Sequence, residues 1–132
     1  MALTAGVWKA NLNGTEAELN IGMPNQQGIF VGQLTGIDFR GFWDEASQTI
    51  AFALTIRVDA TRDDGTPIIA SFRGHLFRSP PNPEPGRDLV AMLTGSYQMS
   101  AELPGTGTGL FPSMGSSRRN VFGWLAQILE TQ

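Results

Sequence analysis

The chain has 132 residues, a net charge of −3 and no cysteine; Lys9 is its one lysine, and its arginines are scattered. A chain of this length fits one domain and can bury a core without a disulfide or a metal. The lack of cysteine excludes disulfide frameworks, thiolate zinc sites and a cysteine nucleophile. Because no basic stripe is present, we expect no binding of nucleic acid.

Short runs rich in Val, Ile, Phe, Leu and Thr are separated by many of the 16 glycines and 8 prolines, a pattern typical of strands joined by turns. The clearest run begins at Thr15: Ala17, Leu19 and Ile21 alternate with polar residues, which predicts a strand with one apolar face. Asn13-Gly14 before it is a tight-turn dipeptide. The predicted strands span residues 6–13, 15–23, 29–34, 37–44, 49–58, 68–78, 89–99 and 120–129.

Two longer connections interrupt this series, a proline-rich stretch at 79–87 and a Gly/Thr/Ser-rich loop at about 103–119. The last segment, 121–129, is predicted as a strand, with a short helix as the alternative. Closely spaced strands favour hairpins and an antiparallel sheet, and eight of them can close without a free edge. We therefore predict an all-β, eight-stranded antiparallel meander barrel as a single domain over residues 1–132, with a two-sheet sandwich as the alternative.

Four predicted strands carry apolar residues on both faces, as in Phe42-Trp43 and Trp124-Leu125. A lone barrel needs only one apolar face. The excess predicts a buried outer surface, most simply in a homodimer or homotetramer. The alternative is that barrel ends and loops pack over these side chains.

The segment Gly6-Val7-Trp8, followed by Asn11, Leu12 and Gly14, resembles the opening strand of the avidin and streptavidin family. Gly28-Ile29-Phe30-Val31-Gly32-Gln33-Leu34 is similar to that family's third strand, and Phe52 and Phe72-Arg73-Gly74 follow in similar order. The resemblance covers most of the chain as a strand pattern. It implies an up-and-down barrel of the avidin/lipocalin type, open at one end and often tetrameric.

In the avidin family, tryptophans near the ends of strands five and seven and one from a neighbouring subunit hold biotin, while polar side chains grip its ureido group. Here neither 52–57 nor 90–97 contains a tryptophan, and Ala10 stands where the family has its strand-one asparagine. Of the biotin set, Thr15 alone can replace a hydroxyl. The resemblance therefore implies the barrel without tight biotin binding, because function resides in the site and not in the fold.

The single histidine, His75, shares a predicted strand face with Arg73 and Phe77. It is a candidate general base or ligand-binding donor, and the alternative is an outward-facing surface histidine. The carboxylate pairs Asp44-Glu45 and Asp63-Asp64 fall in predicted turns, where Asp favours turn hydrogen bonds over acid–base chemistry. We therefore expect no catalytic residue, no metal site and no cofactor.

The stretch Gly105-Thr106-Gly107-Thr108-Gly109 lacks the lysine and the following helix of a phosphate loop and is interpreted as a flexible connection. Its continuation, Leu110-Phe111-Pro112, is apolar and must bury, either as a lid over a barrel mouth or in a neighbouring subunit. Trp8, Trp43 and Trp124 are predicted core residues.

The leading functional hypothesis is a non-catalytic homo-oligomeric barrel that binds a small hydrophobic or amphipathic ligand in its mouth. The alternatives are a structural or interaction protein whose barrel faces serve only assembly, and a cavity enzyme such as an isomerase or cyclase. No signal segment and no bilayer-spanning run is visible, so a cytoplasmic protein is the default expectation, although a removed leader would leave no trace. The expected ligand-binding residues of the mouth and loop are Thr15, Phe42, Tyr97, Phe111 and Trp124.

Overall fold

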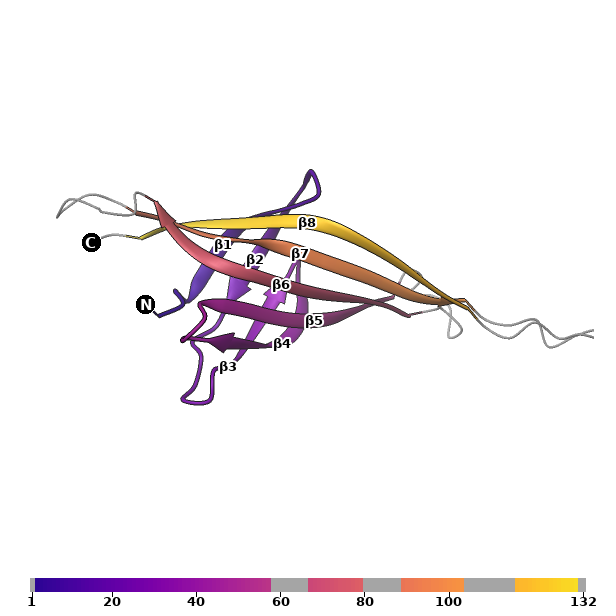
Figure 1. Ribbon diagram of the computed structural model, residues 1–132, viewed down its shortest axis with the longest axis horizontal. Helices are drawn as coiled ribbons and strands as arrows, with labels where there is room; N and C mark the ends of the chain where they lie inside the picture. Colours follow the sequence, from indigo (N-terminus) through magenta and orange to yellow (C-terminus); the bar gives the residue numbers. More distant parts are fainter. Residues whose placement is uncertain (1, 58–66, 80–88, 104–115, 131–132) are drawn as a thin grey trace, which may run out of the picture.

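The computed structural model describes residues 2–57, 67–79, 89–103 and 116–130. The described residues form strands and turns, and none of them forms a helix that could span a membrane. The strands are β1 (Gly6–Leu12), β2 (Thr15–Ile21), β3 (Ile29–Leu34), β4 (Ile37–Asp44), β5 (Thr49–Arg57), β6 (Pro67–Ser79), β7 (Leu89–Leu103) and β8 (Ser116–Glu130) (Figure 1).

Each strand pairs antiparallel with the next one along the chain, and β8 returns to β1 to close the barrel. The predicted eight-stranded meander barrel is therefore confirmed, the sandwich alternative is wrong, and the last segment is a strand. Two tight turns help to set this order. Positive φ angles at Asn13 and Gly14 (52° and 95°) and at Thr35 and Gly36 (49° and 81°) match the twist of the hairpins they join.

The strands β6, β7 and β8 are 13, 15 and 15 residues long, whereas β1 to β5 have six to nine residues. They extend past the body of the barrel at the end away from the N-terminus (Figure 1). The loop predicted at about 103–119 is thus too long, because β7 runs to Leu103 and pairs there with Ser116 of β8. The sequence does not reveal this part of the ladder, because residues 100–103 and 116–119 show no regular alternation of apolar and polar residues.

The core consists of the inward-facing side chains of all eight strands, and no polar or charged residue is buried among those described. The prediction of three core tryptophans is confirmed, because the exposed fractions of Trp8, Trp43 and Trp124 are 0%, 4% and 5%. Each indole N–H has an acceptor, which removes the penalty of burying a donor. Trp8 donates to the Thr4 carbonyl (3.1 Å) and Trp43 to the Glu45 carboxylate (2.6 Å).

The end of the barrel next to the N-terminus is closed. Leu3 is 2% exposed there, and Arg78 joins the incoming chain to β8. Its guanidinium donates to both carboxylate oxygens of Glu130 (2.8 and 3.2 Å) and to the Ala2 carbonyl (2.9 Å), and the Thr4 hydroxyl donates to the same carboxylate. Burial raises the pKa of Glu130, but the hydrogen bonds from Arg78 and Thr4 and the charge of Arg78 outweigh it and lower that pKa overall.

Candidate functional site

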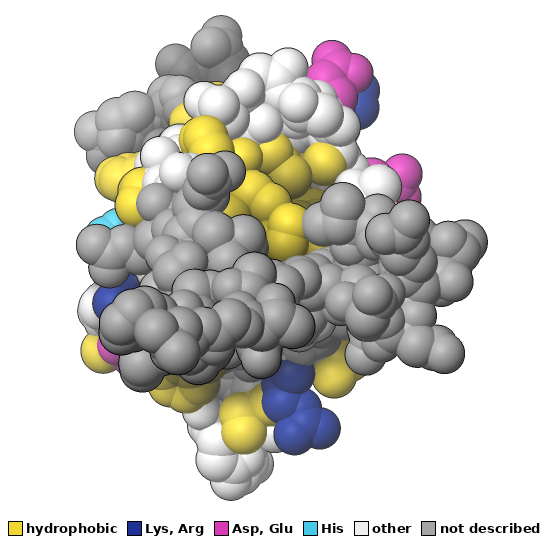
Figure 2. Space-filling view, turned by 90° about the vertical axis from the view of Figure 1, so that its right-hand side faces the viewer, with side chains coloured by type: hydrophobic (Ala, Val, Ile, Leu, Met, Phe, Trp, Pro, Cys, Tyr) yellow, Lys and Arg dark blue, Asp and Glu magenta, His cyan; other side chains and the backbone are white. Residues whose placement is uncertain are grey.

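The opposite end of the barrel, the mouth, carries an apolar lining. In a meander, the β1–β2 and β3–β4 turns lie at the same end as the last residues of β5 and β7 and the first residues of β6 and β8. The half-buried side chains that these segments direct inward pack on the core and are all apolar. They are Leu12, Ala17, Ile37, Ile56, Met99 and Phe122. Figure 2 views the barrel from this end and shows a hollow with apolar side chains at its centre.

Five aromatic rings form a row beneath the mouth, one from each strand from β4 to β8. Neighbouring rings in the row Phe39, Phe52, Phe72, Tyr97 and Phe122 have centroids 4.3, 4.7, 4.8 and 5.2 Å apart. The register explains the row, because Phe52 pairs with Phe72, Phe72 with Tyr97, and Tyr97 with Phe122. The first three pairs are stacked and the fourth, Tyr97 with Phe122, is tilted. Such aromatic pairs add to the stability gained from burying their area.

Trp124 fills the space across this row. Its ring meets Phe52 and Phe72 edge-on, with centroids 5.9 and 5.6 Å away. Its N–H lies within hydrogen-bond distance of the carbonyl oxygens of Arg73 (3.0 Å) and Ser96 (3.1 Å). The row and this indole together make a floor, so the space for a ligand is limited to the mouth above them.

The Tyr97 hydroxyl is the one side-chain polar group in this floor apart from the bonded indole N–H. Tyr97 is 9% exposed, and burial raises the pKa of its phenol, so the hydroxyl is neutral and can donate. Among the described residues it forms no hydrogen bond. A ligand in the mouth therefore meets an apolar wall with a single neutral donor and acceptor group in the floor.

The predicted ligand-binding residues do not all come together. Tyr97 and Trp124 lie in the floor, and Thr15 pairs with Leu12 at the exposed rim. Phe42, in contrast, lies on the outer wall, 49% exposed, because strand alternation directs Trp43 inward and Phe42 outward; it does not belong to the mouth. Phe111 is outside the described residues, so its expected role as a lid or interface residue stays a prediction.

None of the six mouth-lining residues was predicted as a site residue, although the sequence contains a signal for some of them. Leu12 is the last inward-facing apolar residue before the turn at Asn13, and Ile37 is the first after the turn at Gly36, both at the open end. Alternation identifies these positions. The end of the barrel that stays open is set by the N-terminal residues covering the other end, which periodicity does not reveal.

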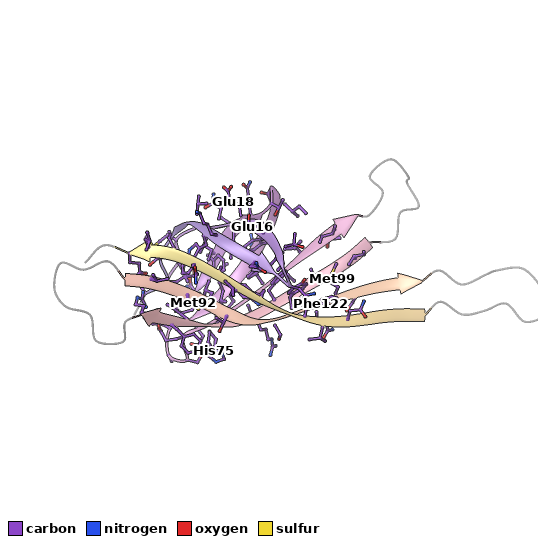
Figure 3. All side chains as sticks on the ribbon, turned by 90° about the horizontal axis from the view of Figure 1, so that it is seen from above. Glu16, Glu18, His75, Met92, Met99 and Phe122 are labelled. Atoms are coloured by element: carbon purple, nitrogen blue, oxygen red, sulfur yellow. The ribbon has the colours of Figure 1, made fainter. Side chains whose placement is uncertain are left out.

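The outer wall holds the remaining polar candidates. His75 is exposed and faces outward, as the alternative interpretation predicted, and Figure 3 places it away from Met99 and Phe122. Asp44 accepts hydrogen bonds from the Ser47 hydroxyl (2.6 Å) and the Ala46 N–H (3.3 Å), which is a turn-forming role. Asp63-Asp64 is outside the described residues. Within the described ranges no group of three or more His, Asp or Glu side chains could hold a metal ion.

The outer wall also carries exposed apolar side chains. At the closed end they cross β6, β7, β8 and β1 as a band that includes Phe77 (56% exposed), Leu129 (70%) and Val7 (52%). Phe77 pairs with Met92, and Leu129 pairs with Val90. A shallow groove of about 350 Å³ runs between Val7, Val90 and Leu129. We call these five residues the outer apolar band.

The chain was compared with known proteins. No family model, no curated protein and no solved structure matches it. The barrel shape by itself does not identify a family, so the resemblance to the avidin family stays a prediction.

Proposed function

We propose that this protein is a non-catalytic, homo-oligomeric barrel whose mouth binds a small hydrophobic or amphipathic ligand. The observation that carries the proposal is the apolar lining of the mouth above a floor that contains the Tyr97 hydroxyl. Apolar concave surfaces with a few polar groups are the usual form of small-molecule sites. The floor limits the ligand to a shallow position, in contact with Leu12, Met99 and Phe122.

The proposal excludes tight binding of biotin, even if the chain belongs to the avidin family. A urea-like head group needs several converging hydrogen-bond partners, and the described barrel buries no polar or charged residue. Tyr97 supplies one hydroxyl, and the inward positions of β5 carry Ile50, Phe52 and Leu54. A titration with biotin is expected to give no nanomolar binding.

Homo-oligomerisation is supported by the outer apolar band. The exposed side chains of Phe77 and Leu129 lie next to the half-buried Met92 and Val90. Neighbouring apolar side chains on an outer surface are typical of contact surfaces between proteins. A second candidate function, assembly without any ligand, is favoured by the filled interior beneath the mouth. The two candidates differ in whether the mouth binds anything.

A titration with a naphthalene dye whose fluorescence rises in apolar surroundings tests the ligand site. The Met99→Glu variant puts a charge into the mouth, and we expect it to weaken dye binding roughly tenfold or more, since a desolvated charge is costly there. Gln98→Glu is the matched control, because Gln98 adjoins Met99 on β7 and faces outward. Equal weakening by both variants, or no dye binding by the wild-type protein, would refute a ligand site in the mouth and favour assembly alone.

A further inference from the structure

The Tyr97 hydroxyl is a polar group that the described protein leaves without a partner. The Tyr97 ring packs between Phe72 and Phe122, with centroids 4.8 and 5.2 Å away, and the residue is 9% exposed. The indole N–H groups of the three buried tryptophans all donate to an acceptor, whereas no described residue donates to the Tyr97 hydroxyl or accepts from it. Buried polar groups in native proteins nearly always have a partner, so a partner from outside the barrel wall is expected.

The hydroxyl is not enclosed, although its ring is buried. Among the described residues, the one enclosed side-chain nitrogen or oxygen atom without a partner belongs to Arg78 at the closed end. Toward that end, the next inward position of β7 is Gly95, which pairs with Trp124, and the indole fills the space there. Toward the open end, the next inward position is Met99, a half-buried residue of the mouth lining. A ligand in the mouth can therefore reach the hydroxyl.

The surroundings of the hydroxyl restrict the chemistry of such a ligand. Met99 lies two residues further along β7, and Phe122 is the β8 partner of Tyr97; both line the mouth, where Figure 3 shows them close together. The described lining holds no charged side chain, so an ionised group of a ligand would lose its hydration without gaining a counter-charge. An uncharged ligand that covers the hydroxyl must also accept its hydrogen bond, because a covered donor without an acceptor costs free energy.

We propose that the mouth binds a neutral apolar molecule with one carbonyl oxygen, a ketone, aldehyde or ester, which accepts a hydrogen bond from the Tyr97 hydroxyl. Its hydrocarbon part lies on Met99 and Phe122. This inference rests on the proposed function, because it names the ligand class of the same mouth. A carbonyl fits better than an alcohol, since two hydroxyls share one hydrogen bond and leave one O–H without an acceptor, whereas a carbonyl brings no donor.

The test compares two uncharged probes of one shape, acetylnaphthalene and isopropenylnaphthalene, in which a methylene group replaces the carbonyl oxygen. Competition with the naphthalene dye measures the affinity of each probe for the wild type and for Tyr97→Phe, which loses the hydroxyl and keeps the ring. We expect the variant to bind the ketone roughly five- to tenfold more weakly, the effect of one neutral hydrogen bond, and the alkene within about twofold of wild type. Thr55→Val removes an exposed hydroxyl from β5 and is the matched control, with no change expected for either probe.

Two further measurements use the wild-type chain. Naphthoate, the carboxylate of similar shape, is expected to bind at least about tenfold more weakly than the ketone, because its charge would be desolvated in an apolar mouth. The infrared spectrum of the bound, isotope-labelled ketone should show the carbonyl stretch at a lower frequency than in hexane, as a hydrogen bond to the oxygen causes. The same band should return toward its hexane position in Tyr97→Phe.

The outcomes separate this inference from the proposed function. Equal effects of Tyr97→Phe on the two probes, naphthoate binding as tight as that of the ketone, or a carbonyl stretch unchanged from hexane would overturn the carbonyl ligand. Dye binding by the wild type would then leave the proposed function standing. If neither the dye nor any probe bound the wild type, both the ligand class and the ligand site would be rejected.

Discussion

The indole ring of Trp124 on β8 fills the place that a side chain at Gly74 on β6 would take. A Cβ atom added to Gly74 would lie 2.8 Å from Cζ2 of Trp124, and also 2.9 Å from the Thr94 carbonyl oxygen. The glycine therefore lets the indole come close to β6 and donate to the carbonyl of Arg73. This pair determines how the floor of the mouth is built, because Trp124 contacts two rings of the aromatic row.

The first prediction concerns that space. Gly74→Ala is expected to destabilise the barrel by about 1–3 kcal/mol, the usual effect of overpacking a filled core, measured as the free energy of unfolding in urea. Gly123→Ala on β8 is the control, because its nearest contact for a new Cβ, the Gly95 carbonyl oxygen, is 3.9 Å away. Similar losses in the two variants would show that backbone effects, and not the Trp124 ring, set the requirement for glycine.

The second prediction concerns pH and the closed end. The pKa of Glu130 is lowered in the folded state, so its ion pair with Arg78 stabilises the fold above the pKa of an unfolded glutamate. This stability is lost as pH falls through the folded-state pKa. Glu130→Gln is expected to reduce the free energy of unfolding at pH 7 by about 1–3 kcal/mol, as loss of charge-assisted hydrogen bonds does, and the gap to wild type should shrink in acid. If the difference in free energy of unfolding between wild type and Glu130→Gln stayed constant down to pH 2, the stabilising role of the Glu130 carboxylate would be contradicted.

The third prediction concerns Tyr97, the one tyrosine of the chain. Burial raises the pKa of its phenol, so an absorbance titration should show the phenolate at a higher pH in the folded protein than in urea. The sign for stability follows: a raised pKa means that the folded state holds the proton more tightly, and stability falls as pH rises past the ordinary tyrosine value. The Tyr97→Phe variant should lack this part of the alkaline loss. Coincident titrations in the folded and unfolded states would place the hydroxyl in solvent.

The fourth prediction concerns the outer apolar band. If it joins subunits, Leu129→Glu should lower the mass measured by light scattering, because a charge would be buried without a partner. Ser71→Glu changes an exposed position of β6 outside the band and should leave the mass unchanged. A wild-type protein of monomer mass at all concentrations would remove the basis for proposing this interface.

Much of the barrel could be predicted from local patterns. Residues 29–34 and 37–44 were predicted as strands, and the structure has β3 and β4 at those bounds, because the apolar residues alternate and the turn Thr35-Gly36 accepts positive φ. The extension of β7 and β8 could not be predicted in the same way. There the two strands pair with each other, and residues 100–103 and 116–119 show no regular alternation of apolar and polar residues.

The site was harder to predict than the fold, and Phe42 shows why. Phe42 and Trp43 are adjacent aromatics that must face opposite sides of β4, and no local signal of the pair says which side is the interior. Which side of β4 faces the interior becomes clear only from contacts with other strands. Gly41 shares its face with Trp43, and a Cβ on Gly41 would lie 2.4 Å from the Phe30 ring. A mouth residue can therefore be named from sequence only after the whole wall has been assigned.

The return of β8 to β1 has a consequence for how the chain folds. Seven of the eight strand pairings join consecutive strands, which can form as successive hairpins, whereas the eighth joins Lys9 to Gln127 across nearly the whole chain. A pairing between such distant residues requires the loss of much chain entropy in one step. During synthesis on the ribosome, β1 and β7 would keep open edges until the final strand emerges. Barrel closure is thus expected to be the last and slowest event, and the partly made sheet to be the species most open to misassociation.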